Sequence, residues 1–598
     1  MGLLKKIFGK EENQKLKKIS KINKIEIPPK KKPRKLKRIK NSTSSVFFDK
    51  HGNLIREQNP KTENVAEKRE KIKRENLQKK RFEEEKRAQS FNTQAEPYDF
   101  PGDIFKSIKE SAIKFRDSVI PIKTVNGAKG KAQMILKLPG KIKIAFLTAF
   151  LLIVFLISAI SFNVWVSSFS DKENASVLTE DEIAKLNRLL DNSYPSERGL
   201  SLRPLPYPAK SAKLDVVSGA AILVDAESGC VLFEKNADTV IPPASITKLF
   251  VMYIAFKEIE AGRIHLNDIV PLPEKTWAVN LPRDASLMFL GQGQTVTLDE
   301  LLCGLAVASG NDAALAVAYF ISGSPAAFVE RMNGECRRLG LKHTHFVEPS
   351  GYDENNQTTA RELAEFSRIY VTRFPESIER YHSLKSFAYP LKKNLPAWQQ
   401  DAGDTKAVKQ KNTNPLLGLL DGVDGIKTGF IYESGYNLAL TAKRDGQRFI
   451  SITLQGPGRG SKEGNAGRIH DGTAMMEWAF NAFYDYRPSG ESIYVPALAS
   501  NGEKFVNLVP AWTTSIPVPH LVGETAKESA SQVKIAVNIP PYIYGEVKAG
   551  EKYGEIKYKL GDVTLATVPL IAAKNAGKSG LWGRFWGTLA KRKLEQKK

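Results

Sequence analysis

An uncharged apolar run over residues 144–166 divides this chain of 598 residues into two very different parts. At about 1.5 Å per helical residue, the run can cross the roughly 30 Å hydrocarbon core of a membrane. Core helices of soluble proteins are usually shorter and apolar on one face only. The run is also too long and too far from residue 1 for a cleaved signal peptide. The sequence therefore predicts one transmembrane helix over residues 144–166.

Charge is distributed unevenly on the two sides of this run. Residues 1–143 contain 39 Lys and Arg but only 17 Asp and Glu, so they carry +22 of the formal net charge of +24. Lys141 and Lys143 precede the apolar run, whereas Asp171, Lys172 and Glu173 follow it. Basic segments stay on the cytoplasmic side of a membrane. We therefore expect residues 1–143 to form a cytoplasmic tail and everything beyond the helix to lie outside the cytoplasm.

The tail is basic and expected to be largely disordered. Its densest basic cluster, residues 30–38, fits either attraction to anionic lipid or nucleic acid, or a solvated run of charge that reinforces the topology. Residues 46–55 predict a small β-hairpin. No nucleic-acid-binding motif is present, so no specific nucleic acid is expected as a partner.

Three short strings follow the predicted membrane helix, and together they indicate acyl transfer. They supply a serine nucleophile, a lysine that can accept its proton, a Ser/Asn polar pair, and a cation with a hydroxyl suited to holding a carboxylate. In chain order they are Ser245-Ile-Thr-Lys248, Ser309-Gly-Asn311 and Lys427-Thr-Gly429.

The surroundings of Ser245 distinguish its string from two other Ser-x-x-Lys strings, at Ser111 and Ser531. Ser245 follows two prolines and precedes the apolar run 249–256, so it lies where a helix begins. One helical turn places Lys248 on the same face. Backbone N–H groups and the positive end of the helix dipole then face the serine, where they can stabilise an oxyanion. Ser245 is the candidate nucleophile.

The rest of the chain predicts two ordered domains after a linker. Residues 167–210 contain four prolines and predict an extracytoplasmic linker. Strand pairs over 219–234 and 436–454 bracket mixed helical segments, an α+β arrangement that we expect to cover residues 211–485. Residues 486–573 alternate apolar strands with turns, which is typical of a small all-β domain.

The last segment, residues 574–598, predicts an amphipathic helix. Trp582, Phe585, Trp586 and Leu589 recur at helical spacing beside basic residues. Such a stripe suits a membrane interface, and the alternative is a helix packed on the β domain.

The strings stand within longer runs, over residues 243–249, 301–314, 344–351 and 423–429, and with these the chain resembles a known family. It is similar to the serine D-alanyl-D-alanine carboxypeptidases of the peptidase S11 family, the low-molecular-mass penicillin-binding proteins of bacteria. The resemblance implies a penicillin-binding-protein/β-lactamase-like catalytic domain, an antiparallel sheet with helices on both faces, and then a small all-β domain. It also implies a single-pass protein of the bacterial inner (cytoplasmic) membrane with its catalytic domain in the periplasm.

The resemblance implies a mechanism by residue. Ser245 attacks the carbonyl between the last two D-alanines of a peptidoglycan stem peptide, and Lys248 is the base. Ser309 relays a proton to the leaving amine. The substrate-binding residues are Asn311, Lys427, Thr428, Gly429 and Phe430, and the backbone N–H groups of Ser245 and Phe430 hold the oxyanion. This chain has Phe430-Ile431 where many members have His or another residue and then Thr, which bears on substrate contacts and on acyl-enzyme hydrolysis.

Alternative functions remain open at this point. A DD-endopeptidase uses the same acyl-enzyme and differs in how its pocket admits a cross-linked stem. A class A β-lactamase also needs a glutamate that activates the deacylating water, usually in a Glu-x-x-Leu-Asn string, and no such string is present between Ser309 and Lys427. A hypothesis of another class is a catalytically inactive wall-binding membrane scaffold. The expected partners are stem peptides, β-lactams as inhibitors, and the membrane.

Other chemistry has little support in the sequence, and no cofactor is expected. His343 and His345 lack a third metal ligand at a recognisable spacing. Cys230, Cys303 and Cys336 form no Cys-x-x-Cys pair, and an odd count gives no disulfide framework.

Overall fold

The computed structural model describes residues 47–48, 54–55, 140–168, 178–209, 212–401, 407–501 and 504–596. The chain forms two units, residues 1–138 and residues 139–598. In the first unit β1 (Phe47–Phe48) pairs antiparallel with β2 (Leu54–Ile55), which confirms the predicted hairpin. The other residues of the predicted tail up to 139, on which the expectation of disorder rests, lie outside the described ranges.

The apolar run that the sequence predicts to cross a membrane forms the helix α4 (Gly140–Ser167). Its apolar stretch, Ile144–Ser167, is 24 residues long with a mean hydropathy of 2.7, long and apolar enough to cross a membrane. Large apolar side chains from Ile144 to Val164 are exposed rather than packed into a protein core. A core helix of a soluble protein would bury them.

Part of the expected linker is folded. It contains α5 (Glu180–Ser193), α6 (Pro195–Arg198) and the short strand β3 (Arg203–Pro204). Thr179 caps α5 through a reciprocal bond with Glu182, the capping box that favours a helix start.

Apolar side chains of this segment pack into a protein core. Leu186, Leu190 and Tyr207 belong to the core of the C-terminal β domain. Burial of each leucine there contributes about 1.5–3 kcal/mol. Arg203 of β3 pairs in parallel with Cys230 at the edge of the catalytic sheet. The segment therefore contacts both domains rather than only connecting them.

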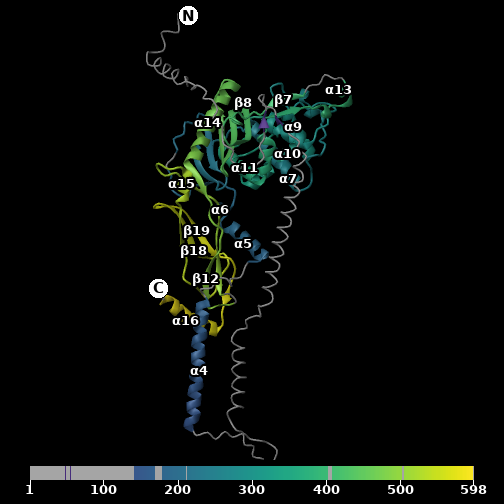
Figure 1. The fold of residues 1–598 in the computed structure, drawn as a ribbon. Helices are drawn as coiled ribbons and strands as arrows, with labels where there is room; N and C mark the ends of the chain where they lie inside the picture. Colours follow the sequence, from purple (N-terminus) through teal and green to yellow (C-terminus); the bar gives the residue numbers. More distant parts are fainter. Residues whose placement is uncertain are drawn as a thin grey trace, which may run out of the picture. The chain divides into compact units, whose positions relative to one another are not determined.

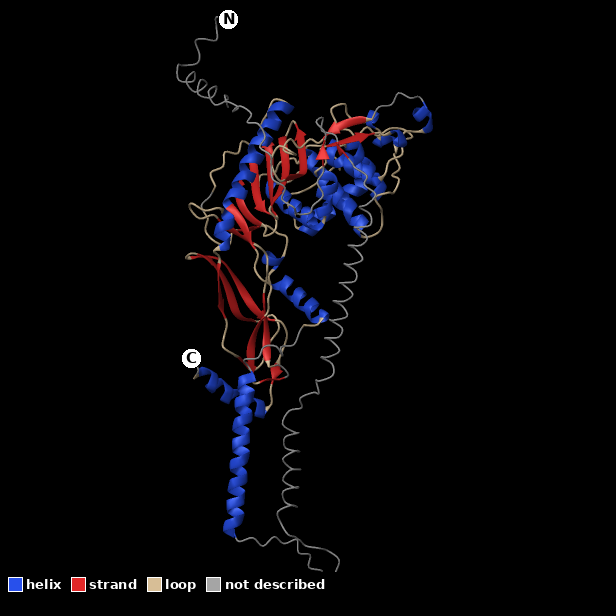
Figure 2. Ribbon diagram, viewed as in Figure 1, coloured by secondary structure: helices blue, strands red, loops and turns tan. Residues whose placement is uncertain are grey.

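The α+β domain predicted over residues 211–485 is built on one sheet with helices packed beside it (Figure 2). The strands of this sheet come from both ends of the domain, which confirms the α+β prediction. The strand order is β3-β5-β4-β10-β9-β8, and every pair except β3–β5 is antiparallel. The expected Asp-Gly turn joins β9 to β10, with Asp445 and Gly446 both at positive φ. Its strands are β4 (Ala220–Asp225), β5 (Cys230–Lys235), β8 (Val423–Ile431), β9 (Gly435–Arg444) and β10 (Gln447–Gly456).

Helices cover both faces of this sheet (Figure 1). α14 (Ser461–Ala482) lies on one face, and a group of helices that includes α7 (Lys248–Glu260) and α11 (Ala360–Arg373) lies on the other. The remaining elements of the domain are α8 (Leu298–Cys303), α9 (Asn311–Ser322), α10 (Pro325–Leu339), α12 (Pro375–Ser377), α13 (Ala397–Asp401), β6 (Ser386–Tyr389) and β7 (Val408–Lys411), with short 3-10 or π-helical turns over 244–247, 274–276, 278–280, 304–308, 378–382 and 392–394.

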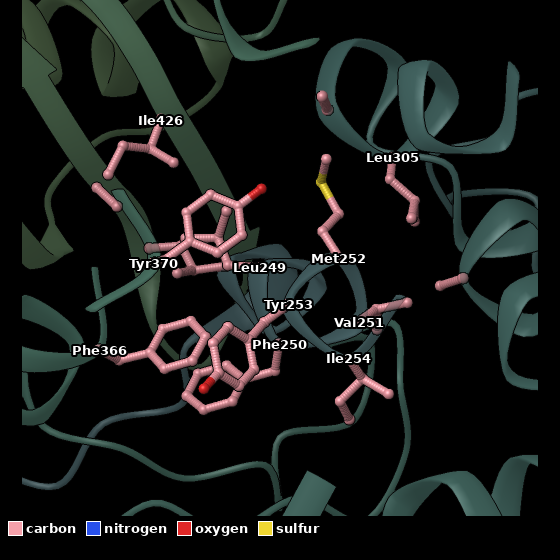
Figure 3. Packing of buried hydrophobic residues seen from close by; sticks show 14 of the residues in the cluster. Leu249, Phe250, Val251, Met252, Tyr253, Ile254, Leu305, Phe366, Tyr370 and Ile426 are labelled. Carbon is pink, nitrogen blue, oxygen red and sulfur yellow. The ribbon is translucent and has the colours of Figure 1, made fainter. Parts of the chain in front are cut away.

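α7 is the central helix of the larger core, as Figure 3 shows. Residues 248–256 of this helix are all buried. The ring of Phe250 stacks on Phe366 of α11 with centroids 3.6 Å apart. Because this helix is packed from all sides, the residues at its N-terminus occupy fixed positions. Ser245 and Lys248 lie at that end.

The second domain is a small β structure, as the sequence predicts. A six-stranded sheet has the order β16-β18-β19-β14-β12-β17, and β11 pairs separately with β15. Its elements are β11 (Phe483–Tyr486), β12 (Ile493–Leu498), β13 (Ser500–Asn501), β14 (Phe505–Pro510), β15 (Ile516–Pro519), α15 (Ala526–Ser531), β16 (Lys534–Asn538), β17 (Ile543–Tyr544), β18 (Lys552–Leu560), β19 (Val563–Ala572) and β20 (Gly577–Lys578).

The chain's last helix, α16 (Leu581–Glu595), divides the predicted stripe between two environments. The Trp586 ring packs on Phe162 of α4, with centroids 5.4 Å apart. Ala590 is buried with Val166 of α4 and Leu498 of β12. Leu581, Trp582 and Phe585 stay exposed. One side of α16 thus packs against protein, and another side exposes apolar side chains.

Candidate active site

The first two predicted site residues meet at the start of α7. Ser245 lies in a 3-10 turn, Ala244–Thr247, and Lys248 is the first residue of α7. Lys248 Nζ is 2.9 Å from Ser245 Oγ and 2.8 Å from Asn311 Oδ1. It also contacts the carbonyl oxygen of Ser350. The lysine amine therefore lies within proton-transfer distance of the candidate nucleophile.

Burial changes the acidity of this amine. Lys248 has no exposed surface. Removal from water disfavours the charged form and lowers the pKa of Lys248 to about 7, while the negative charges of Glu348 and Asp312 act in the opposite direction. A large fraction of the lysine is therefore neutral near neutral pH and can accept a proton from Ser245.

The Ser309 string lies where a π-helical turn ends and α9 begins. Ser309 adopts a left-handed conformation with φ 58°, uncommon for a residue that is not glycine. The Asn311 backbone N–H donates to the Ser286 carbonyl at 2.7 Å. The buried Asp312 carboxylate accepts backbone N–H bonds from Met288 and Leu290, at 2.8 and 3.0 Å. These bonds fix the loop before the string.

Strand β8 brings the third string to the same place. Lys427 Nζ is 2.8 Å from Ser309 Oγ and 3.0 Å from the Thr428 carbonyl. Burial, with the nearby charges of Lys248 and Arg468, lowers the pKa of Lys427 well below its ordinary value. An incoming carboxylate would favour the charged form again. Thr428 Oγ1 is 2.6 Å from Thr413 Oγ1.

Two glycines allow the backbone to approach the Ser245 turn closely. A Cβ on Gly429 would lie 2.6 Å from the Pro243 carbonyl and 3.2 Å from the Ser245 nitrogen. A Cβ on Gly351, at φ +79°, would lie only 1.9 Å from the Ala244 carbonyl. The side chains of larger residues would push β8 and the Gly351 loop away from the nucleophile.

Phe430 continues β8 beyond the glycine. Its side chain is 40% exposed, and its ring packs on Tyr436 with centroids 4.4 Å apart. The ring also lies edge-on to Tyr432. The residue that departs from the usual family pattern thus adds an exposed aromatic surface beside the Lys-Thr-Gly string.

The structure places two more charged residues at the site, to which the sequence alone assigned no role. Glu348 accepts backbone N–H bonds from Ser350 and Tyr352, at 2.7 and 2.8 Å, and so holds the loop whose carbonyl contacts Lys248. Arg468 of α14 donates to the carbonyl of Gly429. Glu348 lies inside the matched run 344–351, whereas Arg468 has no motif that could mark it.

The histidines and cysteines that the sequence singled out lie apart from the Ser245 site. Within the described residues, no group of three or more His, Cys, Asp or Glu side chains could hold a metal ion. His343 instead pairs with Glu362 at 3.0 Å. Burial raises the pKa values of Cys303 and Cys336 to about 12, so both thiols stay protonated.

Two protein-family models match this chain. A family model for D-alanyl-D-alanine carboxypeptidase, peptidase S11, matches residues 208–458, and one for the C-terminal domain of penicillin-binding protein 5 matches residues 489–578. The first range contains all three strings.

Curated relatives match over most of their own length. D-alanyl-D-alanine carboxypeptidase DacC of Escherichia coli is 31% identical over 61% of this chain and 86% of the relative. DacF of Bacillus subtilis is 30% identical over 65% of this chain and 91% of the relative. The crystal structure of penicillin binding protein 5 from Haemophilus influenzae matches with a TM-score of 0.53 and 28% sequence identity. The match covers 62% of this chain and 100% of that protein's chain. The chain belongs to the peptidase S11 family of serine D-alanyl-D-alanine carboxypeptidases.

The pKa of Lys248 generates a pH prediction. Only the neutral amine accepts the Ser245 proton, and the neutral fraction rises as pH rises through about 7. At saturating benzylpenicillin, the acylation rate of the full chain should rise about tenfold per pH unit below that value and level off above it. Stopped-flow or quenched labelling measures the profile. A midpoint near the ordinary lysine value of 10.5 would contradict a buried neutral base.

Proposed function

We propose that this chain is a serine DD-carboxypeptidase that removes the terminal D-alanine from peptidoglycan stem peptides, with Ser245 as nucleophile. The observation that carries the proposal is the 2.9 Å approach of the buried Lys248 amine to Ser245 Oγ. The family membership supports the reaction, and the site geometry supports the assignment of each role.

Acylation displaces the terminal D-alanine from its carbonyl carbon and moves a proton from Ser245 to the leaving amine. Lys248 accepts the proton of Ser245 while Oγ attacks the carbonyl carbon of the D-Ala–D-Ala bond. The backbone N–H groups of Ser245 and Phe430 stabilise the oxyanion of the tetrahedral intermediate. When the intermediate collapses, the C–N bond breaks. Ser309 gives its proton to the departing D-alanine amine and takes up the proton that Lys248 accepted, so Lys248 is neutral again. Water then hydrolyses the ester, with Lys248 as base, and restores Ser245.

The other polar residues bind the substrate. Lys427 and Thr428 hold the terminal carboxylate, because an ammonium and a hydroxyl side by side suit that group. Asn311, whose Oδ1 is held 2.8 Å from Lys248 Nζ, uses its amide N–H₂ for the substrate's peptide carbonyl. A β-lactam carries a reactive amide and a carboxylate, so it acylates Ser245 in the same way and acts as an inhibitor.

The chain is anchored in the bacterial cytoplasmic membrane by α4. Residues 1–143 lie in the cytoplasm, because they are strongly basic, and the catalytic domain lies on the outer side. The Trp586 contact with Phe162 holds α16 near the end of the apolar stretch. The exposed Leu581, Trp582 and Phe585 therefore reach headgroup depth, where aromatic side chains are favoured.

Labelling and product analysis test the enzymatic proposal. The full chain in detergent should form a stable adduct with fluorescent penicillin and release D-alanine from pentapeptide muropeptides. Ser245→Ala should abolish the adduct and lower D-alanine release by about 10⁴ or more. Ser531→Ala, in another Ser-x-x-Lys string, is the matched control and should behave as wild type. An unlabelled, inactive wild type that unfolds cooperatively would favour the scaffold hypothesis, and cleavage of cross-linked dimers without D-alanine release would favour the endopeptidase.

Protease protection tests the topology. In right-side-out membrane vesicles, added protease should digest the catalytic domain and leave a membrane-protected fragment that contains the basic tail. In inverted vesicles the tail should be digested and penicillin labelling retained. The reverse pattern would overturn the proposed orientation.

A further inference from the structure

Arg468 is a buried cation on the side of α14 that faces the sheet, and such helix faces are generally apolar. It lies on the sheet-facing side of α14, one turn from Gly464 and one from Gly472, and is 7% exposed. Within the described part of the chain, no carboxylate forms an ion pair with it, and its hydrogen bonds go to carbonyl oxygens. Burying a charge without a counterion is costly. Packing alone does not account for an arginine here.

The guanidinium bridges two strands beside the active site. Nη2 donates to the Gly429 carbonyl at 2.5 Å, and Nε donates to the Asn437 carbonyl at 3.1 Å. Gly429 and Asn437 are directly opposite each other in the β8–β9 pairing. Nη1 donates to Asn465 Oδ1 at 2.9 Å, and the group lies 5.1 Å from the centroid of the Tyr436 ring. Arg468 is thus fixed on several sides.

The Gly429 carbonyl and the Phe430 N–H belong to one peptide group. Because a trans peptide is planar, these two bonds point in opposite directions. β8 is the edge strand of the sheet, so one side of it is open. When Arg468 holds the carbonyl, the Phe430 N–H points away from α14. The Ser245 nitrogen lies 3.2 Å from the position of a Gly429 Cβ, so both oxyanion donors of the proposed mechanism are close together.

We propose that Arg468 is a positioning residue for the reaction: by holding the Gly429 carbonyl it orients the Phe430 N–H toward the oxyanion. This inference rests on the proposed function. An oxyanion donor that is already oriented stabilises the transition state without reorganisation. Among the described residues, Arg468 hydrogen-bonds to Gly429, Asn437 and Asn465 and to no side chain of the proposed mechanism. Its charge also acts on Lys427, and the proposed positioning role is separate from that electrostatic effect.

The test compares ground-state and transition-state readouts in the full chain in detergent. Arg468→Met fills a similar volume without donating hydrogen bonds. Arg444→Met is the matched control, since Arg444 joins β9 to Glu477 of α14 at 2.6 Å but bonds to no residue of the Lys-Thr-Gly string. The readouts are benzylpenicillin acylation, KM for a pentapeptide, and affinity for a peptide boronic acid, whose tetrahedral adduct places an oxygen in the oxyanion position.

Arg468→Met should slow acylation about 100-fold and weaken boronate binding by a similar factor, the range for loss of one oxyanion donor. Its KM should change less than about threefold, and Arg444→Met should stay near wild type in all three readouts. Arg468→Lys keeps the charge and some of the donors, so it should lose about tenfold.

Wild-type acylation in a folded Arg468→Met variant would overturn the inference. So would an equal loss in KM, acylation and boronate affinity, because that pattern indicates general disruption of the site. If Arg468→Met does not fold, the Arg468→Lys variant provides the test. Wild-type acylation and wild-type boronate affinity in Arg468→Lys would then overturn the inference. A wild-type chain that is not acylated by penicillin defeats the proposed function itself, a distinct outcome.

Discussion

The chemistry of this site depends on the cost of burying an ammonium group. Lys248 lies in the protein interior within 2.9 Å of Ser245 Oγ, and the lost hydration lowers its pKa to about 7. The carboxylates Glu348 and Asp312 favour the charged form of the same amine, and their effect is smaller than that of burial. An ordinary surface lysine would stay protonated and could not accept a proton from the serine.

The fold keeps this lysine buried and in position. α7 is packed on all sides, so its first turn cannot shift without disturbing the core. The Gly351 loop and strand β8 then press against that turn, since glycines at 351 and 429 leave no space for a side chain. Residues that are far apart in the sequence become neighbours of Ser245 for this reason. A second buried lysine, Lys427, lies 2.8 Å from Ser309 Oγ, and we propose that it binds the substrate carboxylate.

The sequence predicted the parts of the structure that depend on local chemistry. The Asp445-Gly446 turn, the helix start after two prolines and the uncharged α4 all follow from short-range preferences. Long-range contacts were not predictable in this way. Prolines suggested a linker before the catalytic domain, but Leu186 and Leu190 form a helical face whose partner lies in the β domain.

Two other findings needed the three-dimensional arrangement. An apolar stripe on a helix can pack against either lipid or protein, so the sequence pattern does not distinguish the two. In the structure Trp586 packs on α4, whereas Trp582 stays exposed. Arg468 belongs to no motif. It contacts a backbone carbonyl, and because every residue has a backbone carbonyl, the sequence does not mark this contact. Seven of the eight proposed site residues could be proposed from the sequence because each supplies a distinctive side chain or a glycine. Phe430 is the exception, since its proposed role is its backbone N–H.

The most direct test of the central claim is a crystal structure of the full chain after reaction with benzylpenicillin. We predict an ester on Ser245 Oγ, with its carbonyl oxygen about 2.7–3.1 Å from the backbone nitrogens of Ser245 and Phe430. The penicillin carboxylate should contact Lys427 and Thr428. An ester on another residue, or a carbonyl oxygen that contacts neither nitrogen, would contradict the account.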